Sequence, residues 1–436
     1  GRGAAASART WEDARRMQVS SYATDERIEK RVLPNGVTVL TQHVPATYSV
    51  VLGVWVQVGS RDEERRVAGI SHFVEHMVFK GTAKRSAYDI ALALERVGGS
   101  LEAHTTKEYT CFYTRVLREH LDLALDVISD LVLGPTFEPE QIQLEKGVVV
   151  EEINNVFDTP DDWIFEILAD KVYSPHPLAH PILGTRDSVT GITQADLREF
   201  MRTNYVGSNV VVSVAGDIDP AGVIDQVEQA FPFRPGAIPH QVGAVDGTRE
   251  TVHFQVDEKL TQQYLVLGCS TMSYRDDERY ALLLALTLLG GGMSSRLFQS
   301  VRENAGLCYA VNTVSEFARD AGIAGTFLAV SPENTRAALD LVWLEYEKLA
   351  RDGVSQRELE DMRNQLKGGM LLGMENVASR MSRMAKNEMN YRRQIPVSEM
   401  LEKLDAVRRD DVVRMVETYF RKESSVLVGL GPVSKL

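Results

Sequence analysis

Residues 71–77 of the chain read Ser-His-Phe-Val-Glu-His-Met. In a helix, His72, Glu75 and His76 lie on one face, because three and four residues separate them. Two neutral imidazoles one helical turn apart can bind one zinc ion, and the carboxylate beside them stays free to act as a base. The order His-x-x-Glu-His is the inverse of the commoner His-Glu-x-x-His arrangement. The stretch therefore predicts a helix that carries two zinc ligands.

A solvent-exposed helix face is the alternative interpretation of the same seven residues. Phe73, Val74 and Met77 lie among the polar residues and indicate that the helix packs against a core. Charged side chains that are buried there need a partner. A bound metal ion provides that partner, so the apolar neighbours favour the zinc site.

A catalytic zinc site needs a third protein ligand and an open position for water. Residues 141–155 read Gln-Ile-Gln-Leu-Glu-Lys-Gly-Val-Val-Val-Glu-Glu-Ile-Asn-Asn and predict a helix. Glu145 and Glu152 are seven residues apart, so they lie two turns apart on one stripe that also carries apolar residues. We expect Glu152 to complete the metal shell and Glu145 to orient a ligand histidine from behind.

These residues resemble the pitrilysin/insulinase family of zinc peptidases with the inverted motif, and Glu152 follows His76 by 76 residues. The resemblance extends to the processing-peptidase branch, which includes the beta subunit of the mitochondrial processing peptidase and bacterial homologues. It runs from about residue 29 to near the C-terminus. The stretches that carry it are residues 53–63 (GVWVQVGSRDE), 72–82 (HFVEHMVFKGT), 181–184 (PILG) and 215–217 (AGD).

The resemblance implies a zinc metalloendopeptidase, a hydrolase in which His72, His76 and Glu152 hold the metal. Zinc in such a site lowers the pKa of its water toward about 7. Glu75 would accept a proton from that water and deliver it to the leaving amine, first as general base and then as general acid.

The resemblance also places the substrate. In family members, the strand after a Gly-Gly turn holds an extended peptide through its main chain, which corresponds here to Ala103, His104 and Thr105. His104 invites assignment as a fourth ligand, but three ligands are already present. We therefore assign it to substrate binding and leave it out of the metal set.

Arg296 and Tyr309 correspond, by the same resemblance, to an arginine/tyrosine pair that contacts substrate near the metal. Positive charge or a hydroxyl there would help to stabilise the oxyanion. The alternative, from the residues alone, is that Arg296 caps a helix and that Tyr309 belongs to the core.

Short sequences recur at a constant separation of 214 residues, as in RDEER at 61–65 and RDDER at 275–279. This predicts two homologous α+β domains related by an internal repeat. The same shift carries the zinc motif onto Leu286, Leu289 and Gly290, so the second copy lacks the ligands. The expected divisions are an N-terminal tail (1–27), a catalytic metal-binding domain (28–232), a linker (233–250) and a non-metal-binding domain (251–436).

Composition limits the class of protein and its partners. The chain has 436 residues, 44% hydrophobic and 25% charged, as in a globular protein of two domains. A net charge of -13 argues against nucleic-acid binding and suits basic peptides. Three widely spaced cysteines argue against a disulfide framework and favour a reducing compartment. No uncharged run reaches the length of a bilayer span, so we expect no membrane anchor.

The resemblance further implies half of a clamshell peptidase chamber, closed by dimerisation. Because one chain carries both the motif and the arginine/tyrosine pair, we expect a homodimer; a heterodimer with a non-catalytic homologue is the alternative. A bacterial cytoplasmic location is expected, with the mitochondrial matrix as alternative. A non-catalytic assembly subunit of the same fold remains the rival function, and a zinc hydrolase of non-peptide substrates is a third.

Overall fold

The computed structural model describes residues 27–237, 243, 245 and 251–435. Almost all of the expected N-terminal tail (1–27) and much of the expected linker (233–250) lie outside the described residues. Within the described residues, no helix combines the length and the apolar character that crossing a membrane requires. Cys111, Cys269 and Cys308 are free and buried.

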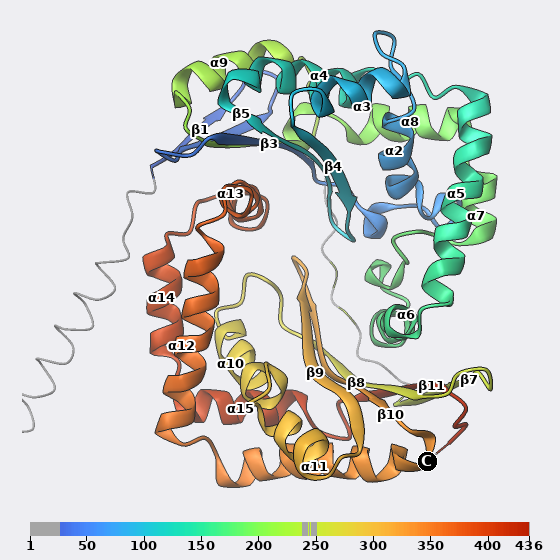
Figure 1. The fold of residues 1–436 in the computed structure, drawn as a ribbon, viewed down its shortest axis with the longest axis vertical. Coiled ribbons are helices and arrows are strands. Elements are labelled where there is room, and N and C mark those ends of the chain that lie inside the picture. Colours follow the sequence, from blue (N-terminus) through green and yellow to red (C-terminus); the bar gives the residue numbers. More distant parts are fainter. Residues whose placement is uncertain (1–26, 238–242, 244, 246–250, 436) are drawn as a thin grey trace, which may run out of the picture.

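The first half of the chain builds a mixed six-stranded sheet in the order β1-β2-β6-β3-β5-β4, so β4 is an edge (Figure 1). Apolar residues, most of them valine, fill the central strands β3 and β6, which are buried almost throughout, as strands covered on both faces should be. A tight turn at residues 33–37 joins the first two strands as a hairpin. The strands are β1 (Ile28–Val32), β2 (Thr38–His43), β3 (Ser49–Val56), β4 (Ser100–Thr105), β5 (Thr110–Leu117) and β6 (Val210–Gly216).

Helices of the first half cover this sheet and form the main core with it. Two of them carry the stretches that the sequence analysis selected: α2 contains the His-x-x-Glu-His motif and α5 contains both selected glutamates. The helices are α2 (Ile70–Val78), α3 (Ala87–Glu95), α4 (Leu121–Leu133), α5 (Pro139–Phe157), α6 (Pro160–Tyr173), α7 (Arg186–Gly191), α8 (Gln194–Asn204) and α9 (Pro220–Ala230).

The second half builds a five-stranded sheet in the order β7-β11-β8-β10-β9, with a separate core (Figure 1). The strands are β7 (Val252–Val256), β8 (Gln263–Thr271), β9 (Cys308–Phe317), β10 (Gly322–Val330) and β11 (Val426–Gly431). The helices are α10 (Arg279–Gly290), α11 (Thr335–Asp352), α12 (Gln356–Gly373), α13 (Val377–Tyr391), α14 (Val397–Ala406) and α15 (Arg409–Tyr419).

The two halves share one plan. β3 begins at Ser49 and β8 at Gln263, and α4 begins at Leu121 and α11 at Thr335, so equivalent elements lie 214 residues apart. The edge strand β4 has its counterpart in the edge strand β9. The α+β class with an internal repeat is therefore confirmed.

One helix of each half packs on the sheet of the other half. Helix α6 packs on β8 and β11 of the second sheet, while its counterpart α13 packs on β3 and β6 of the first (Figure 1). At the second contact, Trp55 Nε1 donates to Sδ of Met381 at 3.4 Å, and Ser213 Oγ donates to the carbonyl of Met381 at 2.7 Å. The exchange buries apolar surface from both halves, which holds the two sheets in one arrangement.

Candidate metal centre

Gly69 directly precedes helix α2, and its φ of 90° suits glycine. A Cβ there would lie 2.5 Å from the carbonyl oxygen of Leu183, so the loop at 181–184 packs directly on the start of the helix. The buried carboxylate of Glu63 accepts hydrogen bonds from the backbone N–H of Gly69 at 2.6 Å and of Ser71 at 2.8 Å. These bonds satisfy backbone donors that the helix itself leaves free.

Glu63 positions the site, although it was not among the residues predicted from the sequence. The residue lies in the stretch 53–63 that carries the family resemblance, but nothing in its sequence context signals burial. Burial raises the pKa of its carboxyl to about 8, against the lowering effect of its hydrogen bonds.

The two faces of α2 differ as the motif requires. Phe73, Val74 and Met77 are fully buried in the first core, whereas His72, Glu75 and His76 are only partly buried on the opposite side. The apolar residues therefore fix the rotation of the helix and turn the motif toward α5 and β4.

Three side chains converge at this face. Nε2 of His72 and Nε2 of His76 lie 3.2 Å apart, and Oε2 of Glu152 lies 3.7 Å from the first and 3.4 Å from the second. All three donor atoms fall within 4.8 Å of one another. Oε2 of Glu152 is buried and has no hydrogen-bond partner. Two imidazole nitrogens and an unpartnered carboxylate oxygen form a donor set that fits a zinc ion.

Glu145 lies behind this group. Its Oε1 is 2.8 Å from Nδ1 of His76, and its Oε2 is 2.6 Å from Nζ of Lys80. Burial alone would raise the pKa of this carboxyl, but its bonds to His76 and Lys80 lower the pKa on balance. Glu145 thus stays charged, and the ring of His76 is held with Nε2 toward the other two donors. The sequence analysis did not foresee the part of Lys80.

The two histidines differ in protonation. Burial, and then the neighbouring His76, lower the pKa of His72 to about 3, so this ring is neutral at physiological pH. Burial lowers the pKa of His76 as well, but Glu145 and Glu152 outweigh it and raise the pKa above its ordinary value. Of the two rings, His76 therefore binds a proton more tightly than His72, so protons compete with a metal ion mainly at His76.

Glu75 stands beside the three donors and faces the edge strand. Its carboxylate accepts a hydrogen bond from Oγ1 of Thr105, the last residue of β4. Burial raises the pKa of Glu75, although the bond from Thr105 opposes the rise. A carboxylate whose pKa is raised above its ordinary value is a stronger proton acceptor, as general-base catalysis requires.

A cavity of about 960 Å³ opens in front of these residues. His72 and Glu75 line it, together with Ala103, His104 and Thr105 of β4. Its remaining wall comes from α5, α6, the segment 179–187 and strand β7 of the second half, and it includes a tilted aromatic pair whose ring centres lie 3.9 Å apart. The apolar residues that α5 and α6 contribute to this wall were not predicted from the sequence; they are Ile153, Val156, Phe157, Trp163 and Ile167.

Arg296 and Tyr309 do not line this cavity. Arg296 donates to Glu358 at 2.8 Å and to the carbonyl of Gly353, the residue that follows α11, at 3.2 Å. Tyr309 is 74% exposed, so its alternative assignment to the core is wrong. Within one chain, the structure does not bring this pair to the motif.

Comparisons with known proteins agree with this architecture. Residues 38–186 match the family described as Insulinase (Peptidase family M16), and residues 191–366 match the Peptidase M16 inactive domain. A protease of Helicobacter pylori has a similar fold, with a TM-score of 0.87 and 21% identity, covering 93% of this chain and 99% of its own. A structure from Pseudomonas fluorescens, described as a peptidase M16 inactive domain, gives a TM-score of 0.86 and 21% identity, covering 93% of this chain and 98% of its own.

Relatives in sequence are named as uncharacterized zinc proteases. One from Streptomyces coelicolor is 35% identical over 99% of this chain and 96% of its own length. One from Bacillus subtilis is 36% identical over 91% of this chain and 96% of its own length. One from Mycobacterium tuberculosis is 36% identical over 92% of this chain and 93% of its own length. With family matches over both halves and relatives of this identity along nearly the whole chain, the protein belongs to the insulinase family, peptidase family M16.

Proposed function

We propose that the protein is a zinc-dependent endopeptidase that cleaves extended peptides. The observation that carries the proposal is the convergence of His72, His76 and Glu152 beside Glu75 at the open edge of a sheet. The names of the relatives as zinc proteases support the choice of metal and of reaction.

His72, His76 and Glu152 would hold the zinc ion, and Glu145 would fix the ring of His76 from behind. When bound, zinc supplies Lewis-acid activation of water and of a peptide carbonyl. Glu75 would take the proton of the attacking water on its carboxylate and pass it to the leaving nitrogen. Burial raises the pKa of Glu75, which makes its carboxylate a stronger base for the first of these steps.

The edge strand β4 would hold the substrate. Its free main-chain groups can pair with an extended peptide, which then passes in front of Glu75. Ala103, His104 and Thr105 line the cavity at this point, so they are the proposed substrate-binding residues. The overall charge of -13 favours basic peptides.

Arg296 and Tyr309 would serve a site on a second copy of the chain. Tyr309 is exposed and neither residue lines the cavity of its own chain, which supports this arrangement. A homodimer would then enclose two sites in a chamber, each completed by the second half of the partner. A heterodimer with a non-catalytic homologue is the alternative for the same surface.

A pool of unrelated peptides, digested and mapped by mass spectrometry, tests the proposal. We expect cleavage by the wild type, none by Glu75→Gln at wild-type zinc content, and full cleavage by Glu151→Gln, in which an exposed glutamate of the same α5 is replaced. A non-catalytic assembly subunit would bind zinc and cut nothing, and a hydrolase of other substrates would also leave the pool intact. Either outcome would reject the peptidase.

A further inference from the structure

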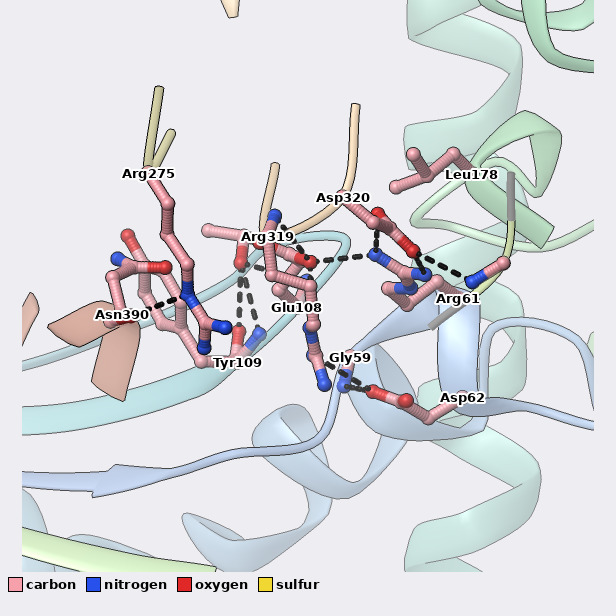
Figure 2. Close-up of polar contacts among 12 residues, drawn as sticks. Gly59, Arg61, Asp62, Glu108, Tyr109, Leu178, Arg275, Arg319, Asp320 and Asn390 are labelled. Carbon is pink, nitrogen blue, oxygen red and sulfur yellow. Dashed lines mark hydrogen bonds and ion pairs between the residues drawn. The ribbon is translucent and has the colours of Figure 1, made fainter. Parts of the chain in front are cut away.

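A buried ion-pair cluster joins the two halves close to the substrate strand (Figure 2). Its centre is Arg61, whose side chain is 3% exposed and lies in the short helix η1 (Ser60–Asp62). The guanidinium donates to both carboxylate oxygens of Asp320, at 2.7 and 2.6 Å, and to Glu108 at 2.7 Å. A bidentate ion pair of this kind fixes the orientation of the two side chains as well as the distance between them.

The three residues come from separate segments. Glu108 lies in the turn between β4 and β5, and Asp320 lies in the turn between β9 and β10 of the second half. These turns join equivalent strand pairs of the repeat. Arg319 strengthens the contact between them, since its Nε donates to Glu108 at 2.8 Å and its backbone N–H donates to the same carboxylate. The turn between β9 and β10, in the half without the zinc motif, therefore holds the turn between β4 and β5, in the half that carries the motif.

The held turn adjoins the proposed site. Thr105, which donates to Glu75, lies three residues before Glu108. The backbone N–H groups of Ser60 and Arg61 donate to the carbonyls of Thr106 and Lys107, at 3.2 and 3.0 Å. The end of β4 is thus attached to η1 on one side and to the second half on the other.

The chain approaches itself so closely here that a side chain would not fit. A Cβ at Gly59 would lie 2.3 Å from the carbonyl oxygen of Thr106. Glu63 follows η1 directly, and its carboxylate accepts the backbone N–H groups of Gly69 and Ser71 at the start of α2. One junction therefore sets both the strand that faces the substrate and the helix that carries Glu75.

Of the charged residues in this cluster, Asp320 is the one whose removal would most disturb the buried guanidinium of Arg61. Its side chain is 3% exposed and supplies both acceptors for the fork of Arg61. Without this carboxylate, the buried guanidinium keeps only Glu108, which Arg319 also engages. A buried charge that loses its partner is costly, so the segments around it would shift until the charge reaches water.

We propose that Asp320, in the half that lacks the metal motif, is a positioning residue that sets the edge strand β4 against Glu75 through Arg61 and Glu108. This inference rests on the proposed peptidase function. It gives the second half a part in the reaction of its own chain, separate from any contact with a second copy. Asp320 acts only through the strand that binds the peptide, so its loss affects substrate binding more than zinc binding.

The test compares Asp320→Asn with a matched control, Glu388→Gln. Glu388 is also buried and also forms an ion pair between the halves, with Lys30 at 2.7 Å, but this pair joins β1 to α13. We expect Asp320→Asn to raise KM for a peptide substrate about tenfold, since small displacements of positioning groups are costly. We expect kcat to fall less, zinc content to stay unchanged, and the conservative Asp320→Glu to recover part of the loss.

Hydrogen exchange of residues 103–109 provides a readout without catalysis. Asp320→Asn should speed exchange in this segment, while Glu388→Gln should leave it unchanged. If Asp320→Asn does not fold, Arg319→Gln removes a less buried bond to Glu108 and should shift exchange and KM in the same direction.

The outcomes separate the two proposals. Unchanged KM and unchanged exchange in Asp320→Asn would overturn the positioning role, and so would an equal effect of Glu388→Gln, which would indicate general loosening between the halves. A wild type that cleaves no peptide would instead reject the peptidase function, and the exchange experiment would still decide whether Asp320 holds β4.

Discussion

Replacing Glu145 by glutamine tests how the metal centre is supported from behind. The carboxylate is 5% exposed and bonds Nδ1 of His76 at 2.8 Å and Nζ of Lys80 at 2.6 Å. Glutamine keeps the shape and one acceptor for His76 but removes the negative charge. The ring would then be a weaker electron donor and less firmly oriented, while none of the three proposed ligands is altered.

The expected magnitude follows from these contacts. Loss of a supporting partner typically lowers metal affinity by about 10- to 100-fold, or about 1.4 to 2.8 kcal/mol. Because Glu145 is screened from water and bonds His76 directly, we expect about a 30-fold increase in the zinc dissociation constant. The difference in zinc dissociation constant between the variant and the wild type should become smaller at acidic pH. In the wild type the pKa of His76 is raised, so protons compete with zinc for this ring.

Competition with a chelator of known affinity measures the zinc dissociation constant at several pH values. Glu151→Gln provides the control, because it removes a charge from the exposed side of the same helix. At saturating zinc, Glu145→Gln should recover most of its peptide cleavage, since Glu75 and the edge strand are untouched. A dissociation constant within about twofold of the wild type would refute the supporting role.

Three further experiments address other parts of the site. Glu152→Ala should lower zinc content well below one ion per chain, as measured by elemental analysis; full occupancy would contradict its role as third ligand. Glu63 has a pKa of about 8 in the folded chain, whereas the free side chain has a pKa of 4.5. Between pH 4.5 and about pH 8, the carboxyl of Glu63 is therefore protonated in the folded state and ionised in the unfolded state. Stability to urea should therefore fall as pH rises through this window, by at most about 1.4 kcal/mol per pH unit, and Glu63→Gln should flatten the dependence. Mixing inactive Glu75→Gln and Arg296→Ala chains should restore about a quarter of wild-type cleavage if two copies share each site, because half of random dimers then hold one intact site; no recovery would contradict sharing.

Sequence reasoning located the groups whose geometry is set by short-range periodicity. His72, Glu75 and His76 share a face because a helix repeats every 3.6 residues, and the same rule aligns Glu145 with Glu152 on α5. The apolar residues between them then decide which way each face points. Spacing alone could not show that α2 and α5 pack together, and for that step the family resemblance was needed.

The features that escaped prediction depend on contacts between distant segments. Lys80 and Glu63 look like ordinary surface charges in sequence, because only the packing around them decides their burial. Arg61 and Asp320 lie 259 residues apart, and the repeat gives no hint of their pairing. Arg61 recurs as Arg275, yet Arg275 donates to the carbonyl of Asn390 (Figure 2) and has no carboxylate partner among the described residues.

The different partners of Arg61 and Arg275 are consistent with a repeat whose two copies differ in function. The first copy keeps the polar motif on α2, whereas the same positions of the second are Leu286, Leu289 and Gly290 inside a core. A copy without ligands is still needed, because its α13 covers the first sheet and its turn at Asp320 holds the end of β4. If that were only scaffolding, Asp320→Asn and Glu388→Gln would weaken the protein alike. A selective effect of Asp320 on peptide binding would show that the second half contributes to the site of its own chain.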